Sequence, residues 1–252
     1  MAKAQNIEII GNLIDNFVHA ELYNTQKDVE SVFDMEDGFR DTMWMRMCIE
    51  NLKKDPASLR IIEGRYVGPE YNLEEMLRLP TNSLGYTYAK LMSTKKLHPH
   101  FYRDRTNTDS ETDYVTMRVR KTHDMYHIIS GFDMHVGEIG AIALNVAQYG
   151  YPSFMLLELI SLIMACFPGL NGETELKKGK SSADESLSYE VFDTLSLGIK
   201  MGRECKPLFP IKFEDMFNKP LQEVRNELNI IPVREGPVSW YQDSELKDLK
   251  LS

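Results

Sequence analysis

The 252-residue sequence has little cysteine, and the three present (Cys48, Cys166 and Cys205) are far apart and form no Cys-x-x-Cys pair. Neither a disulfide framework nor a zinc site built from thiolates is indicated, and the chain fits a reducing compartment. The first ten residues, MAKAQNIEII, have no basic segment followed by an apolar core, and they do not resemble an arginine-rich transit sequence. We therefore expect a cytoplasmic protein.

Positive charge and long apolar runs are also scarce. Lys and Arg number 29 against 38 Asp and Glu, so the formal net charge is −9. This charge argues against nucleic acid as a partner, because phosphate binding needs a basic surface. It argues against purely electrostatic docking on anionic lipid as well, though not against docking through an apolar patch.

The nearest candidate for a membrane span, residues 154–167, contains Glu158 and lies between Pro152 and Pro168. It is too short to cross a bilayer. As a helix it would be apolar almost all round, which predicts either burial or contact with lipid on one side.

Strand-like alternation is nearly absent, whereas apolar residues recur at helical spacing along most of the chain. We predict helices over residues 10–17, 39–52, 72–79, 82–92, 109–130, 133–149, 154–167, 182–205 and 220–230. The expected N-caps are Asn72, Asn82 and Asp133, Gly131 is expected to end a helix, and Pro220 is expected at a first helical position. No internal repeat or linker-like segment occurs. The sequence therefore predicts an all-α fold with a single multi-helix domain over residues 1–252.

Three of the six histidines fall within the stretch HDMYHIISGFDMHVGE. His123 and His127 are four residues apart, so on a helix they point the same way, with Asp124 on a shared edge. Two imidazoles at this spacing are the usual way for one helix to offer two nitrogens to a metal ion. If the next helix is antiparallel, it brings Glu138 back towards the pair. Such a set suits zinc, manganese or iron, and magnesium if the substrate supplies oxygens.

An ordinary polar helix face is the competing interpretation of the same residues. His135 lies off that face, and we expect it at the surface. The spacing does not fit H-E-x-x-H peptidases, because Asp124 stands in the place of their glutamate base and Glu138 follows too soon. The His-Asp pair also fits part of the pattern of metal-dependent phosphohydrolases, which need a further histidine upstream and an aspartate downstream.

Several ordered motifs resemble those of the coenzyme Q biosynthesis protein four family. HDMYH followed by Glu138 in GEIG resembles the family's His-Asp-x-x-His and later glutamate, with an interval one residue shorter here. MLRLPTNSLGYTYAKLM is similar to its Leu-Pro-x-x-Ser-Leu-Gly-x-x-Tyr segment, and YVTMRVRKTHD to its Tyr-Val-x-x-Arg approach to the motif. MGRECKPLFPIKFEDMFNKPLQEVRNELNI looks like its C-terminal stretch. The resemblance covers about residues 73–230.

This resemblance implies an all-α, often dimeric protein with one divalent ion (zinc, magnesium or manganese) at His123, Asp124, His127 and Glu138. It also implies action on a polyprenylated quinone precursor with an anionic head, peripheral association with membranes, and organisation of the other quinone-biosynthesis enzymes. The family is associated with removal of the carboxyl group at ring carbon one of polyprenyl hydroxybenzoate. A metal-dependent lyase, with Asp124 as a ligand or proton relay, is one hypothesis. A non-catalytic lipid-binding scaffold is the second, and a phosphohydrolase the third.

A polyprenyl tail needs a long apolar channel, and the chain has fourteen methionines, which adapt to irregular apolar shapes. The helix at 154–167 is the best candidate for lining such a channel, and an ordinary core helix is the alternative. Arg118 and Arg120 come about one turn or less before His123. Because a guanidinium suits carboxylate or phosphate, we expect both to hold the anionic head group; a solvated arginine is the alternative.

Overall fold

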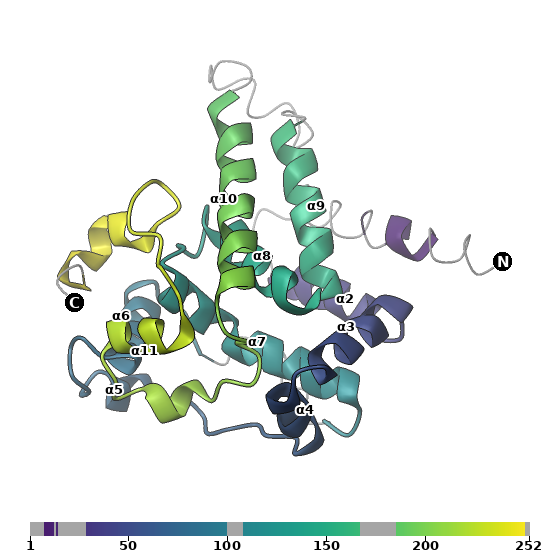
Figure 1. Ribbon diagram of the computed structural model, residues 1–252. Coiled ribbons are helices and arrows are strands. Elements are labelled where there is room, and N and C mark those ends of the chain that lie inside the picture. Colours follow the sequence, from purple (N-terminus) through teal and green to yellow (C-terminus); the bar gives the residue numbers. More distant parts are fainter. Residues whose placement is uncertain (1–7, 13, 15–28, 100–107, 167–184, 250–252) are drawn as a thin grey trace.

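The computed structural model describes residues 8–12, 14, 29–99, 108–166 and 185–249 (Figure 1). Within these ranges the chain is helical, without a strand and with two isolated bridges. The all-α class predicted from the missing alternation is confirmed. The α-helices are α2 (Val29–Gly38), α3 (Met43–Lys53), α4 (Pro56–Glu63), α5 (Leu73–Met76), α6 (Leu84–Thr94), α7 (Glu111–Ser130), α8 (Glu138–Tyr149), α9 (Pro152–Cys166), α10 (Glu185–Glu204) and α11 (Leu221–Leu228). Three short 3₁₀ helices follow loops: η2 (Phe213–Met216), η3 (Trp240–Gln242) and η4 (Ser244–Leu249).

Local capping explains where several helices begin and end. The Asn72 side chain caps α5 as expected, accepting from the backbone N–H groups of its first turn. Gly131 ends α7 with φ at 86°, a left-handed conformation that favours glycine. Helix α6 is capped by Ser83, so the expected cap at Asn82 is wrong by one residue. Pro220 lies at the cap of α11 and not at its first helical position.

The start of α8 differs most from the expectation. The helix begins at Glu138, so Asp133 is not its cap. The Asp133 carboxylate instead accepts from the backbone N–H groups of His135 and Gly137, at 2.6 and 3.2 Å. It therefore stabilises the turn that precedes α8. The expected helix over residues 10–17 lies largely outside the described residues, as does Phe167 at the end of the expected 154–167 helix.

Helix α7 lies in the body of the molecule, and nearly all of its residues are buried (Figure 1). Its apolar side chains contribute to two core clusters, one with α6 and α11 and the other with α3, α4, α8 and α9. Buried cations on the same helix have partners, as buried charges must. Lys121 donates to the carbonyl oxygens of Val67 and Pro69, each at 2.7 Å. Helix α7 is thus packed against other helices around most of its circumference, so the side chains that it carries have little freedom to move.

Helices α9 and α10 rise together above the rest of the molecule, with α8 at their base (Figure 1). Helices α8 and α10 pack closely, because a Cβ added at Gly198 or Gly202 would lie 2.3 or 2.4 Å from a carbonyl oxygen of α8. Only glycine allows this approach. The base of the pair is therefore tied firmly to the helix that begins at Glu138.

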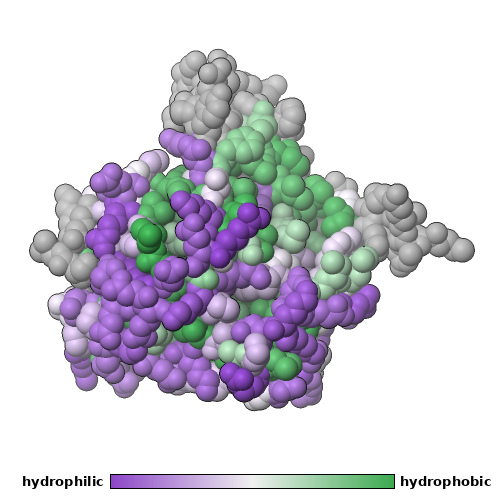
Figure 2. Space-filling view, in the orientation of Figure 1, coloured by the Kyte–Doolittle hydropathy of each residue, from purple (hydrophilic) through white to green (hydrophobic). Residues whose placement is uncertain are grey.

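Helix α9 is buried on one side and exposed on the other. Phe154, Leu156 and Ile160 are at most 5% exposed. Met155, Leu159 and Ile163, spaced four apart, are 46, 57 and 44% exposed. Figure 2 shows hydrophobic surface gathered over this helix. Among the described residues, no helix combines the length and apolar character that a membrane span requires.

Candidate metal centre

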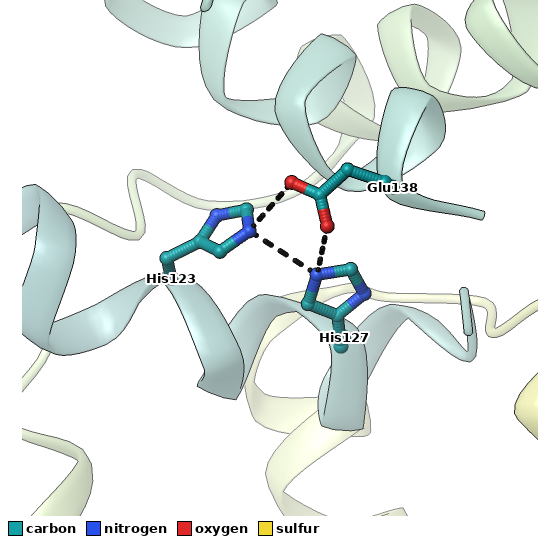
Figure 3. Close-up of side chains that lie close together, drawn as sticks. All are labelled: His123, His127 and Glu138. Carbon is teal, nitrogen blue, oxygen red and sulfur yellow. Dashed lines mark hydrogen bonds and ion pairs between the residues drawn. The ribbon is translucent and has the colours of Figure 1, made fainter. Parts of the chain in front are cut away.

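Two histidines of α7 and the first residue of α8 converge on one point (Figure 3). The Nε2 atom of His123 lies 2.9 Å from one carboxylate oxygen of Glu138, and Nε2 of His127 lies 3.0 Å from the other. The two Nε2 atoms are 3.2 Å apart. The spacing on α7 and the reversal of the chain at Gly131 therefore bring together three of the four predicted ligands.

The hydrogen bond on the far side of His127 defines its ring. Its Nδ1 atom lies 3.2 Å from the carbonyl oxygen of Phe132, which can only accept, so Nδ1 carries the hydrogen. The lone pair of Nε2 then points at His123 and Glu138. Metal-ligating histidines are commonly held in this way by a carbonyl behind them.

The three atoms need a cation between them, because a carboxylate and two imidazole lone pairs cannot satisfy one another. A proton on His123 is one solution and a metal ion is the other. Ligand atoms at the corners of a tetrahedron around zinc lie about 3.3 Å apart, given bonds of about 2.0–2.1 Å. The observed separations of 2.9 to 3.2 Å are close to that value. The residues present fit a divalent ion.

The charges of the site reinforce one another. Burial by itself lowers the pKa of His123, but Glu138, with smaller effects from Asp124 and Glu36, raises it to about 9. Burial by itself raises the pKa of Glu138. The combined effect of His123 and His127 is larger and opposite, so the pKa of this carboxyl group lies well below its ordinary value. In the metal-free chain the site is therefore an imidazolium–carboxylate pair, and a metal ion would displace the proton from His123.

His123 is held by packing where His127 is held by a hydrogen bond. The ring of His123 meets the ring of His127 edge-on at 4.9 Å and that of Phe154 at 5.3 Å. In the part of the chain that the structure describes, its Nδ1 atom is buried without a hydrogen-bond partner. The contact with Phe154 connects the site to α9.

Asp124 does not belong to the converging group. Its side chain is buried, and one residue along a helix turns it about 100° from His123. Burial raises the pKa of its carboxyl group, an effect that the positive charges of His123 and His127 partly offset. Its predicted role as a ligand or proton relay stays a prediction. His135 is exposed and outside the site, as expected.

Arg118 and Arg120 are buried and have partners within the chain. Arg118 donates to the carbonyl oxygens of Phe209 and Ile211. Arg120 forms an ion pair with Glu36. These contacts connect α7 to other parts of the fold, and the predicted role of both arginines in holding a head group stays a prediction.

Comparison with known protein families shows which family the chain belongs to. Residues 41–234 match the family model described as coenzyme Q (ubiquinone) biosynthesis protein Coq4. This chain belongs to that family. The match begins at residue 41, so it extends further towards the N-terminus than the motifs between residues 73 and 230 indicate. All three converging residues lie inside it.

Relatives named ubiquinone biosynthesis protein COQ4, mitochondrial, are 27 and 28% identical to this chain over the aligned residues. The protein from Kluyveromyces lactis is 28% identical over 192 residues, which cover 73% of this chain and 53% of that protein. The one from Zygosaccharomyces rouxii is 27% identical over 217 residues, covering 81% and 60%. This chain therefore spans a little over half the length of these relatives. Their names include the word mitochondrial, and the predicted cytoplasmic location is not confirmed.

A solved structure has the same fold. A crystallised chain from Nostoc punctiforme PCC 73102 superposes with a TM-score of 0.70 at 24% identity, covering 86% of this chain and 95% of that one. At this identity the likeness concerns the fold alone, and it agrees with the helical architecture described above.

The sequence did not point to the carbonyl of Phe132 behind His127. Every residue type carries a backbone carbonyl, so no pattern of side chains could have revealed it.

Proposed function

We propose that this Coq4-family chain acts in ubiquinone biosynthesis by binding a polyprenylated precursor beside one divalent metal ion held by His123, His127 and Glu138. Membership of the family supports the biosynthetic role. The convergence of three ligand atoms within 4.8 Å of one another supports the metal site. Zinc, magnesium and manganese are the candidate ions.

The arrangement suits a site that also receives a substrate. Catalytic zinc sites have three protein ligands and leave a further position for water or substrate, whereas structural sites have four protein ligands. The Glu138 side chain is 42% exposed, while that of His127 is 1% exposed. An oxygen atom of a bound head group can therefore approach from the side of Glu138.

Removal of the carboxyl group at ring carbon one is the reaction we propose for the head group. A bound ion would supply Lewis acidity towards the carboxylate or phenolate oxygens. Loss of CO₂ leaves a ring carbon that must take up a proton. Asp124 is buried, and burial raises the pKa of its carboxyl group, which suits it to carry that proton.

The tail of such a precursor needs apolar contact that begins near the metal site. Phe154 of α9 contacts the His123 ring, and Met155, Leu159 and Ile163 continue along that helix as an exposed apolar row. We propose that this row meets the polyprenyl tail and the surface of the membrane that contains it. Peripheral attachment through apolar side chains is compatible with a net charge of −9.

Conversion of a defined precursor tests this proposal. The parent chain, loaded with zinc, magnesium or manganese, is incubated with a polyprenyl hydroxybenzoate, and loss of the carboxyl group is followed by mass spectrometry. We expect conversion by the parent and by His135→Ala. Glu138→Gln should slow conversion by about a hundredfold or more, because it weakens the ion's ligand set.

Two other results would change the assignment. Retention of the lipid without conversion would favour the scaffold that presents its lipid to other quinone-biosynthesis enzymes. Failure of the parent to retain or convert the lipid would contradict the proposal. The third hypothesis, a metal-dependent phosphohydrolase, gains no support from membership of this family. The homodimer implied by the resemblance also stays a prediction.

A further inference from the structure

The C-terminal end of α7, which carries His127, is held by residues about a hundred positions later in the chain. The last four carbonyl groups of a helix have no partner within it. In α7 the carbonyl of His127 accepts from the indole N–H of Trp240 at 3.0 Å as well as from Gly131, and that of Ser130 accepts from Val233 at 2.8 Å. Of the last four carbonyls of α7, only those of Ile128 and Ile129 then still need a hydrogen-bond donor.

Arg225 supplies those partners. Its guanidinium donates to the carbonyl oxygens of Ile128 and Ile129, each at 2.8 Å. The side chain is 1% exposed, and its positive charge lies at the negative end of the α7 dipole. The four carbonyls are thus held by α11 and the segment that follows it.

The same segment holds Phe132, whose carbonyl fixes the ring of His127. Phe132 pairs with Ser239 in an isolated antiparallel bridge. On either side of it, Trp240 donates to the carbonyl of Gly131 at 3.0 Å, and Asp133 donates to that of Val238 at 2.8 Å. The direction of the Phe132 carbonyl is consequently set by backbone pairing with residues 238–240.

The turn between α7 and α8 lies so close to residues 233–238 that two of its positions have no room for a side chain. A Cβ at Gly131 would lie 2.3 Å from the carbonyl oxygen of Val233, and one at Gly137 would lie 2.6 Å from that of Val238. The turn between the two ligand-bearing helices therefore packs directly on the backbone of this later segment. We call residues 233–240 the C-terminal clamp.

We infer that the C-terminal clamp, through Trp240, positions His127 as a ligand by keeping its ring in the Nδ1–H form with Nε2 directed at the site. This inference rests on the proposed metal site and adds a positioning residue to it. Trp240 touches neither His123 nor Glu138 in the contacts described, and it lies beyond residues 41–234, the range that the family model matches. It acts through the carbonyl of His127, which accepts its indole N–H, and through that of Gly131, which accepts its backbone N–H beside Phe132.

Trp240→Phe is the sharpest variant, because it removes the indole N–H but retains an aromatic ring beside Tyr241. In the parent chain the rings of Trp240 and Tyr241 are stacked with their centroids 3.9 Å apart. The matched control is Tyr114→Phe. It also removes one hydrogen bond from a buried aromatic ring to a carbonyl, that of Tyr66 at 2.9 Å, near the opposite end of α7. Both variants are compared with the parent chain at equal temperature and pH.

Two readouts separate positioning from general stability. In the metal-free chain, nitrogen NMR of His127 should show the single Nδ1–H form in the parent and in Tyr114→Phe, and a mixture of both forms in Trp240→Phe. With zinc alone as the probe, Trp240→Phe should bind roughly tenfold more weakly, as for other residues that orient metal ligands, and Tyr114→Phe less than about twofold more weakly.

The inference is overturned if Trp240→Phe keeps the same single form of His127 as Tyr114→Phe. Failure of the parent chain to bind zinc, magnesium or manganese would contradict the proposed metal site. In that case the NMR comparison in the metal-free chain would still show whether the clamp orients His127. Failure of the metal site and failure of the positioning role are therefore distinguishable.

Discussion

At the scale of single residues, the candidate metal centre contains two histidines that are held in different ways. His127 has a carbonyl partner that fixes its ring, whereas His123 is oriented by contact with two other rings. The i and i+4 spacing was sufficient to predict that both point the same way. The spacing could not tell that Asp124, the next residue, lies outside the group that converges with Glu138, because the partner helix determines which side of α7 faces that carboxylate.

The arginines show a second limit of sequence reasoning at this scale. Arg118 and Arg120 lie near the histidines along the chain, which suggested a head-group site, but each has internal partners. The partners come from residues 36, 209 and 211, which are distant in sequence. Arg225 and Trp240 were missed for the same reason, since their acceptors lie at residues 127–129.

Glu158 carries the residue-scale prediction. It is 9% exposed, and among the described residues one of its carboxylate oxygens is buried without a hydrogen-bond partner. Burial raises its pKa from 4.5 to about 7. Between these values the folded chain holds more protons than the unfolded chain, so the free energy of unfolding falls as the pH rises through that window. Glu158→Gln should therefore melt roughly 5–10 °C above the parent at pH 8, and the difference should be much smaller at pH 5.

Thermal melting at the two pH values checks this expectation. The control is Glu204→Gln, which removes the same charge from an exposed position on α10. Its difference from the parent should not depend on pH. An equal difference for Glu158→Gln at pH 5 and pH 8 would show that the carboxyl group titrates alike in the folded and unfolded chains.

At the scale of elements, helix type was easier to predict than helix boundaries. The apolar spacing correctly indicated α3, α7 and α10, but it missed both α2 and α4 entirely. A signal was present there, because Asp55 caps α4 and Pro56 occupies its first position. Ser83 in place of Asn82 at the start of α6 shows that neighbouring polar residues can compete for a cap, and that packing decides between them.

Helix α9 combines the two roles that its sequence left open. Ile160 lies in a cluster with Leu156, Met35 and Phe39, while Leu159, the residue before it, is exposed. An apolar stretch without a polar face cannot reveal which of its sides faces the core. Both core packing and apolar exposure occur on this one helix.

Two lysine substitutions separate the sides of α9. Ile160→Lys should lower the free energy of unfolding by several kcal/mol, because it buries an unpaired charge. Leu159→Lys should change it by less than about 0.5 kcal/mol, as exposed substitutions usually do, and should weaken flotation with neutral phosphatidylcholine vesicles. Denaturant titration and vesicle flotation provide the two measurements. Unchanged flotation of a folded Leu159→Lys chain would rule out this row as the membrane contact.

At the scale of the whole molecule, the absence of alternation predicted the all-α class, and the histidine pattern predicted where the chemistry lies. What remained hidden was how the parts meet. Helix α7 supplies two of the candidate ligands, α8 supplies the third, and the C-terminal clamp contacts the turn between these helices. The contacts of the clamp with this turn join segments about a hundred residues apart, which no local pattern encodes. Helix α9, which carries the exposed apolar row, contacts the same site through Phe154 on its buried side.

Metal content is the measurement that tests the central claim most directly. The parent, His123→Ala, Glu138→Ala and the control His135→Ala are each saturated with zinc, dialysed and analysed by mass spectrometry for bound metal. The convergence of the three ligand atoms predicts about one ion per chain in the parent and in His135→Ala, and a sharp loss in the other two, because removing one of three ligands weakens the site. Equal metal in all four folded proteins, or none in the parent, would contradict the account.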